Sequence, residues 1–260
     1  MSILQAAILG IIQGLTEFLP VSSSGHLVLM QRIFGLSTDA VLFDTALHLG
    51  TLFSLFFAMP KECSLLIKKP FSKMWWLLIT ATLPTVAAAL IFGDKIEAAF
   101  SGDFLFLGFL LTSLVLFICE RISMRTKNAS MEVGYKNALI MGLMQALATL
   151  PGLSRSGSTA AGGLLSGLKR STAVDFAMLM SIPAILGSIA YKGIDIIKTG
   201  ADTSLILPSI VGMLFSAVFG FFSVKIMLNA VKKRRLYPFC VYTGVLGAFL
   251  LINKLFLNII

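Results

Sequence analysis

Two short polar segments interrupt a chain that is otherwise strongly apolar, and they occupy matching positions in its two halves. The segments are TEFLPVSSSGH (16–26) and TLPGLSRSGST (149–159). A shift of 132 residues aligns several identical residues, namely Gly10 with Gly142, Gln13 with Gln145, Ser22 with Ser154, Ser24 with Ser156 and Gly25 with Gly157. The charged positions differ, with Glu17 against Thr149, Ser23 against Arg155 and His26 against Ser158. The pattern predicts a duplicated fold whose two copies have different chemical roles.

Composition places this chain in a membrane. Hydrophobic residues make up 57% of its 260 residues and charged residues only 13%, whereas a soluble domain has about 25% charged residues. Apolar runs close to the length that crosses a bilayer predict six membrane helices near 41–59, 74–92, 104–119, 173–191, 205–227 and 237–257. We therefore expect one all-α polytopic membrane domain over residues 1–260.

The two regions that contain the polar segments do not fit this spanning pattern. Residues 3–34 and 137–168 are apolar, but Pro, Gly and Ser break each of them in the middle. Neither half of either region is long enough to cross the hydrocarbon comfortably. Irregular backbone at membrane depth is tolerated only where protein buries it or it lines a cavity. We predict two re-entrant helical hairpins with the polar segments at their tips.

The loop charges predict how the chain is oriented. Loops 60–73, 120–136 and 232–235 are basic, which is typical of the cytoplasmic side, whereas loops 93–103 and 192–202 carry both signs. This distribution accounts for the net charge of +9 without a nucleic-acid partner. Each half then holds one hairpin, which does not cross the membrane, and three spans. An odd number of spans makes the second half begin on the opposite side from the first, so the halves are inverted. We predict inverted repeats over 1–125 and 133–260, with hairpin tips that meet inside the membrane.

Two smaller features set further expectations. Residues 1–31 contain no Lys or Arg, so we expect no cleavable signal peptide. Cys63, Cys119 and Cys240 have neither metal-binding nor disulfide spacing, and we expect them to be small apolar packing residues.

The polar tips have the composition of a phosphate site. A charged group at the centre of a membrane helix costs roughly 2.5–3.5 kcal/mol, a cost that Glu17 and Arg155 offset if they share one site. Helix N-termini with an adjacent Arg bind phosphate well, and Ser22–Gly25 and Ser156–Thr159 are candidate N-caps. An ion pair that only locks the hairpins together is the structural alternative. The candidate phosphate-binding residues are Ser22, Ser24, Gly25, Ser154, Ser156, Gly157 and Thr159, and Ser158 adds a further hydroxyl at the second tip.

Several side chains near the first tip are suited to metal binding or catalysis. Gln13 and Glu17 share one helix face, and oxygen ligands facing a phosphate suggest Mg²⁺ or Ca²⁺. Glu17 is alternatively a general base for water. His26 is a candidate nucleophile or acid–base group, or else a helix–helix hydrogen-bonding group. Asp44 and His48 also share a helix face and are candidates to support the site from behind. We expect Asp175 to have a structural role at a helix start.

At these residues the chain resembles the bacterial undecaprenyl-diphosphate phosphatase family, the bacitracin-resistance type of membrane phosphatase. The family's Glu/Gln-x-x-x-Glu motif matches Gln13 to Glu17 and continues to His26, and its Pro-Gly-x-Ser-Arg-Ser motif matches Pro151 to Ser156. The resemblance covers almost the whole chain. Position 13 is Gln where many relatives have Glu, which weakens any site that needs two metal-binding carboxylates from this helix.

The resemblance implies hydrolysis of undecaprenyl diphosphate to the monophosphate and inorganic phosphate, which recycles the lipid carrier of cell-wall synthesis. It further implies a bacterial plasma-membrane protein whose site opens to the outer face, divalent-metal dependence, and Glu17, Ser23, His26 and Arg155 as the functional set. The sequence leaves open which of His26 or Ser23 is the nucleophile, and whether the protein forms a homodimer. The rival interpretation is a transporter or flippase for a lipid phosphate or anion, because inverted repeats suit alternating access as well as hydrolysis.

Overall fold

The fold is all-α over the residues that the computed structural model describes, which are 1–36, 40–125, 129–199, 202–232 and 236–257. Six helices are long and apolar enough to cross a membrane. They are α3 (Val41–Ala58), α5 (Lys73–Ala99), α6 (Leu105–Arg125), α9 (Arg170–Thr199), α10 (Ile206–Lys232) and α11 (Tyr237–Ile252). The six predicted spans are confirmed, and the protein is a multi-pass helical membrane protein.

Several of these helices extend beyond the apolar runs from which they were predicted. Asp94, Lys95 and Glu97 lie in the last turns of α5, and Lys192 and Lys198 lie in α9, although all five were assigned to loops. The apolar run predicts only the part of a helix that lipid surrounds, because backbone hydrogen bonding continues the helix into water. Pro84 in α5 and Pro183 in α9 do not end their helices, as is common in membrane helices.

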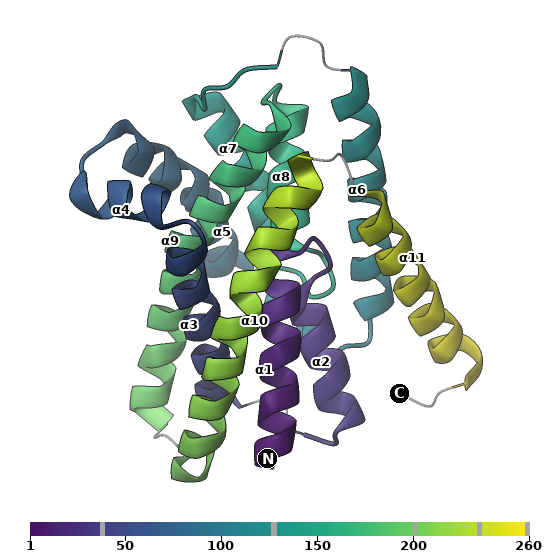
Figure 1. The fold of residues 1–260 in the computed structure, drawn as a ribbon. Helices are drawn as coiled ribbons and strands as arrows, with labels where there is room; N and C mark the ends of the chain where they lie inside the picture. Colours follow the sequence, from purple (N-terminus) through teal and green to yellow (C-terminus); the bar gives the residue numbers. More distant parts are fainter. Residues whose placement is uncertain (37–39, 126–128, 200–201, 233–235, 258–260) are drawn as a thin grey trace.

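Two short helical hairpins lie between the long helices. The first consists of α1 (Ile3–Phe18) and α2 (Ser23–Ile33), and the second of α7 (Tyr135–Leu147) and α8 (Arg155–Leu165). The hairpins enter the bundle from opposite ends, and their connecting turns lie near its mid-height (Figure 1). This arrangement supports the predicted re-entrant hairpins.

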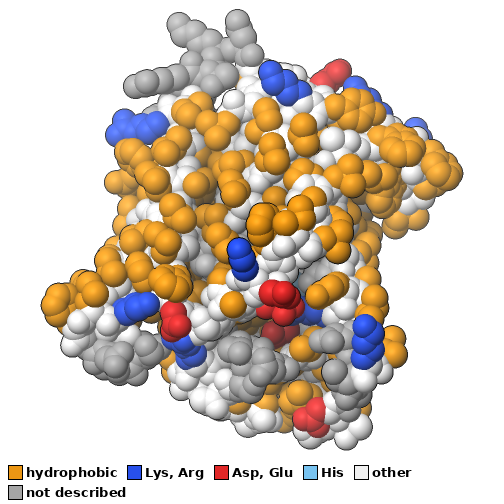
Figure 2. Space-filling model, turned by 180° about the vertical axis from the view of Figure 1, so that it is seen from behind, with side chains coloured by type: hydrophobic (Ala, Val, Ile, Leu, Met, Phe, Trp, Pro, Cys, Tyr) orange, Lys and Arg blue, Asp and Glu red, His pale blue; other side chains and the backbone are white. Residues whose placement is uncertain are grey.

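The connections between the long helices lie alternately at the two ends of the bundle, as the loop charges predict. The α6–α7 connection, α4 (Pro60–Lys68) and the end of α10 lie at one end of the bundle, whereas the α5–α6 and α9–α10 connections lie at the other (Figure 1). Within the basic loops, residues 126–128 and 233–235 are outside the described residues, as are the side chains of Arg125 and Lys232. Hydrophobic side chains form a wide band over one face, with most charged side chains above and below it (Figure 2).

Helix α4 is a short element that the sequence did not predict. Pro60 starts this helix, Cys63 and Leu66 face the protein, and Trp75 Nε1 donates a 2.8 Å hydrogen bond to the Leu66 carbonyl. Burial raises the pKa of the Cys63 thiol to about 11, so the thiol is protonated and unreactive. All three cysteines are free and buried, which confirms the packing role expected for them.

Matching glycines allow close helix packing in both halves. A Cβ atom on Gly10 of α1 would lie 2.4 Å from the Gly212 carbonyl oxygen of α10, and one on Gly142 of α7 would lie 2.3 Å from the Ala81 carbonyl oxygen of α5. Both contacts join a hairpin to the second span of the opposite half. Because Gly10 and Gly142 are aligned by the 132-residue shift, these contacts support the predicted internal repeat.

A substitution at Gly142 tests this packing. Gly142→Ala places a methyl group against backbone that cannot move away locally, so we expect a loss of about 1–3 kcal/mol in unfolding free energy. Gly187→Ala in α9 is the matched control, because a Cβ atom there meets nothing within 4 Å. Denaturant unfolding in detergent should separate the two variants, and equal stabilities would contradict the packing account.

Candidate active site at the meeting of two hairpin tips

The tips of the two hairpins are in direct contact. Ser156 Oγ of α8 donates a 2.9 Å hydrogen bond to the Leu19 carbonyl oxygen at the end of α1. A Cβ atom on Gly25 would lie 2.9 Å from the Gly152 Cα atom, which shows how closely the two backbones approach. Residues more than 120 positions apart in the sequence are therefore assembled into one site.

The two turns cap the following helix with the same hydrogen bond. Ser22 caps α2 by accepting a hydrogen bond from the Gly25 N–H, and Ser154 caps α8 by accepting one from the Gly157 N–H. In each turn the capping hydroxyl also contacts a second serine, Ser24 at 3.3 Å and Ser156 at 3.2 Å. The predicted cap at Ser22 is confirmed. The prediction that α8 is capped at Ser156 was wrong, because the helix begins two residues earlier and Ser154 makes the capping bond.

Glu17 lies at the centre of the site and contacts three side chains. Its Oε1 atom forms an ion pair with Arg155 Nη2 across the two hairpins. Its Oε2 atom accepts hydrogen bonds of 2.5 Å from Ser23 Oγ and 3.0 Å from Gln13 Nε2. The side chain of Glu17 is 1% exposed and that of Arg155 is 26% exposed. A carboxylate this deeply buried is stable only when it is paired in this way.

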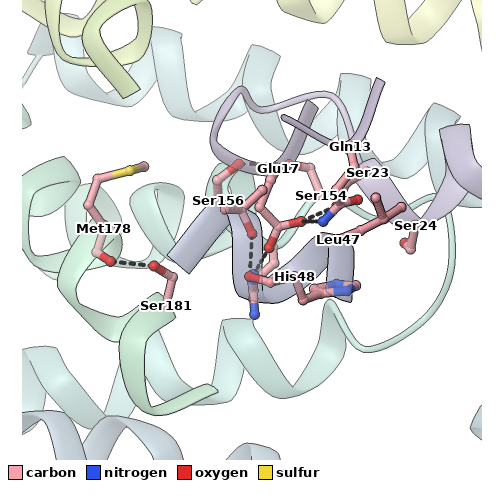
Figure 3. Close-up of polar contacts among 12 residues, drawn as sticks. Gln13, Glu17, Ser23, Ser24, Leu47, His48, Ser154, Ser156, Met178 and Ser181 are labelled. Atoms are coloured by element: carbon pink, nitrogen blue, oxygen red, sulfur yellow. Dashed lines mark hydrogen bonds and ion pairs between the residues drawn. The ribbon is translucent and has the colours of Figure 1, made fainter. Parts of the chain in front are cut away.

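Of the two predicted supporting residues, His48 lies near this carboxylate, whereas Asp44 contacts Gln31 of α2. His48 of α3 is close enough to interact electrostatically with Glu17, and both are labelled in Figure 3. The His48 Nδ1 atom lies 2.8 Å from the Asp44 carbonyl oxygen, and the Asp44 carboxylate accepts a 3.2 Å hydrogen bond from Gln31. The Asp44 side chain therefore links α3 to α2. Asp175 is exposed in the second turn of α9.

Many of the candidate phosphate-binding groups already have structural partners. The N–H groups of Gly25 and Gly157 are used by the two caps. Thr159 Oγ1 donates within α8, to the carbonyl oxygens of Arg155 and Ser156. Ser158 Oγ is buried and has no hydrogen-bond partner among the described residues. Because Glu17 engages only Nη2, the other guanidinium N–H groups of Arg155 are the strongest candidate anion donors.

The imidazole of His26 is hydrogen-bonded to Ser22 and Tyr242 and not to Glu17. Its Nδ1 atom lies 2.7 Å from the Ser22 carbonyl oxygen and its Nε2 atom 2.7 Å from the hydroxyl of Tyr242 on α11. The ring packs edge-to-face on Phe109 of α6, with centroids 5.2 Å apart. Tyr242 could not be identified from the sequence, since one tyrosine in an apolar span carries no spacing signal.

Thr112 is a second residue whose contact with the site was not predicted from the sequence. Its hydroxyl donates a 2.9 Å hydrogen bond to the Gly152 carbonyl oxygen and accepts a 2.9 Å bond from the Ser154 N–H. It therefore links α6 to both sides of the second turn. A buried hydroxyl inside an apolar span was the available signal, because such a group must find a partner.

The residues available for a divalent cation are few. In the part of the chain that the structure describes, no group of three or more His, Cys, Asp and Glu side chains is arranged to hold a metal. Gln13 Oε1 is buried without a hydrogen-bond partner in the same part of the chain, and an amide oxygen is a suitable ligand for Mg²⁺ or Ca²⁺. These residues fit a cation that takes most of its ligands from a bound diphosphate.

An apolar groove of about 650 Å³ lies beside the second tip. Helices α5 and α7 form its walls, Thr149 and Leu150 line its end at the hairpin turn, and Lys95 is the charged residue in its lining. The groove therefore runs along apolar side chains of α5 and α7 and ends at the hairpin turn that precedes Arg155.

The fold and site define a polytopic membrane protein with a charged, hydroxyl-rich site enclosed between two helical hairpins, suited to a phosphorylated lipid. Comparison with known proteins agrees with this class. The family described as "Bacitracin resistance protein BacA" matches residues 6–249, and the chain belongs to this family.

The most similar relatives include several that match over nearly their full length. A protein of Carboxydothermus hydrogenoformans named undecaprenyl-diphosphatase is 42% identical over 97% of each chain. A Bacillus cereus protein named undecaprenyl-diphosphatase 4 is 40% identical over 96% of this chain and 97% of its own. One of Alkaliphilus metalliredigens named undecaprenyl-diphosphatase is 35% identical over 98% of this chain.

Thr112→Val tests how the second turn is held. This substitution keeps the shape of the side chain but leaves the Ser154 N–H without its acceptor, so we expect a loss of about 1–3 kcal/mol in unfolding free energy. Thr82→Val in α5 is the control, because the Thr82 hydroxyl bonds only to the Leu78 carbonyl of its own helix. Equal melting temperatures for the two variants would argue against this role of Thr112.

Proposed function

We propose that this protein is an undecaprenyl-diphosphate phosphatase that releases inorganic phosphate from the lipid diphosphate and leaves the monophosphate. The observation that carries the proposal is the contact of Ser23 Oγ with the buried Glu17 carboxylate, which is itself paired with Arg155. A hydroxyl beside a base and a guanidinium is the arrangement expected of an activated nucleophile at a phosphate site. The names of the relatives supply the substrate.

Ser23 is the better candidate nucleophile of the two that the sequence left open. As Ser23 Oγ attacks the terminal phosphorus, its proton passes to Glu17 over the 2.5 Å hydrogen bond. The bond from this phosphorus to the bridging oxygen breaks, and Glu17 gives the proton to the departing monophosphate. Water then attacks the phosphoserine with Glu17 as base, which releases phosphate and restores the Ser23 hydroxyl. His26 is less suited, because both of its ring nitrogens already have partners.

Arg155 is proposed to bind the diphosphate and to stabilise its transition state. The N–H groups of Arg155 that have no bond among the described residues match phosphate oxygens in geometry and charge, and its position in a largely enclosed site strengthens that interaction. The ion pair with Glu17 holds the guanidinium beside Ser23 before substrate arrives. Positioning and electrostatic stabilisation are the main contributions to phosphoryl transfer.

A divalent cation, Mg²⁺ or Ca²⁺, is proposed to accompany the diphosphate. Gln13 Oε1 would be its protein ligand, with Glu17 beside it, and the cation would offset the charge of the substrate. The groove between α5 and α7 is proposed to hold part of the polyprenyl chain. The basic loops support a site that opens to the outer face of a bacterial plasma membrane.

Alanine substitutions test the proposed roles. Ser23→Ala should reduce phosphate release from a polyprenyl diphosphate to the assay background, because the nucleophile is lost. Arg155→Ala should lower kcat/KM by about a hundredfold to a thousandfold, the usual effect of removing one electrostatic donor. Ser64→Ala and Arg121→Ala, outside the hairpins, are the matched controls. Wild-type turnover in Ser23→Ala would show that this serine is not the nucleophile.

Removal of metal provides a separate test. Chelation with EDTA should abolish phosphate release, and added Mg²⁺ or Ca²⁺ should restore it. Gln13→Ala should raise the cation concentration needed for half-maximal rate, because the variant loses one oxygen ligand. Activity that persists after thorough chelation would count against a required cation.

The transporter alternative is tested on the same purified protein. A detergent solution has no compartments between which a substrate could be carried. Phosphate release in detergent therefore establishes an enzyme. Counterflow of a lipid phosphate in liposomes without any phosphate release would instead establish a carrier. The Ser23–Glu17 contact favours hydrolysis, because transport of an anion needs no activated hydroxyl.

A further inference from the structure

The hydrogen bonds of His26 determine which of its nitrogens carries the proton. The Ser22 carbonyl oxygen can only accept, so the Nδ1 atom 2.7 Å away from it must be protonated. In the neutral ring Nε2 is then an acceptor, and the Tyr242 hydroxyl, 2.7 Å away, is its donor. The tyrosine and imidazole rings are stacked, with an interplanar angle of 10°. Tyr242 and Ser22 together therefore select one tautomer of His26.

The residue that His26 holds has an unusual backbone conformation. Ser22 has φ of 68°, and it is the only non-glycine residue with positive φ in the described ranges. Such a conformation is unfavourable for a residue with a Cβ atom and persists only when its surroundings enforce it. The Ser22 carbonyl accepts two hydrogen bonds from His26, one from the ring and one of 3.2 Å from the backbone N–H. His26 therefore stabilises the strained turn that precedes Ser23.

We propose that Tyr242 is a positioning residue for the reaction, acting on Ser23 through His26 and the Ser22 backbone. The inference rests on the proposed function of Ser23 as nucleophile. Tyr242 belongs to α11, the last span, 216 residues from His26 in the sequence. Its hydroxyl orients the imidazole, the imidazole fixes the Ser22 carbonyl, and the turn then directs the Ser23 hydroxyl at Glu17. His26 in this account holds the nucleophile in place and makes no bond to phosphorus.

Kinetics of Tyr242→Phe test the proposal. The variant keeps the ring on its stacking partner and removes only the hydroxyl, so we expect kcat to fall about threefold to tenfold, the value of one hydrogen bond, with KM unchanged. Tyr237→Phe, at the start of the same helix, is the matched control and should keep the wild-type kcat. A wild-type kcat in Tyr242→Phe, or a rise in KM alone, would overturn the proposal.

Two replacements of His26 separate positioning from chemistry at Nε2. The amide nitrogen of Asn occupies the place of Nδ1 and can still donate to the Ser22 carbonyl, whereas that of Gln reaches the place of Nε2. We expect His26→Asn to retain about threefold to tenfold more activity than His26→Gln, the value of the hydrogen bond to Ser22. Equal or greater activity in His26→Gln would contradict the positioning role.

Nitrogen-15 NMR provides a readout that does not depend on activity. The chain contains two histidines, so His26 and His48 are assigned by substituting one of them. In wild-type protein His26 should show a protonated Nδ1 and an unprotonated Nε2. Tyr242→Phe should shift the Nε2 signal and leave His48 unchanged. A protonated Nε2 in the wild type would overturn the positioning account, whereas an active Ser23→Ala variant would overturn the proposed function instead.

Discussion

The buried ion pair between Glu17 and Arg155 is the interaction on which the site depends. Each charge would be costly alone at this depth in an apolar protein, and each comes from a different hairpin. The two hairpins must therefore meet for either charge to be stable. The first hairpin itself brings Ser23 to the carboxylate, and the meeting of the tips adds the Arg155 guanidinium. One contact thus helps both to join the hairpins and to assemble the site.

The two halves combine similar scaffolds with different chemistry. Ser22 and Ser154 cap their helices in the same way, and Gly10 and Gly142 pack equally closely on the opposite half. The charged positions differ. Gln13 bonds to Glu17, whereas its counterpart Gln145 bonds to Thr85 of α5. A shared capping arrangement with changed side chains allows the first tip to supply Glu17 and Ser23 and the second to supply the Arg155 guanidinium.

Much of the architecture could be predicted from hydrophobicity and charge. The six spans, the two broken segments and the pairing of Glu17 with Arg155 all follow from the cost of exposing polar groups to lipid. The cap at Ser154 was placed two residues late, because TLPGLSRSGST offers three serines and local sequence does not select among them. The structural roles of Thr112 and Tyr242 were not predicted, since each depends on a partner from a distant helix.

By itself, the sequence determined that this protein spans a membrane, that its polar residues gather at two matching tips, and to which family it belongs. These properties depend on composition and local order along the chain. Only the tertiary structure decided which hydroxyl contacts the Glu17 carboxylate and which groups the imidazole contacts. Ser23 contacts Glu17 while His26 turns to Tyr242, because helix packing fixes side-chain directions that residue spacing alone leaves open.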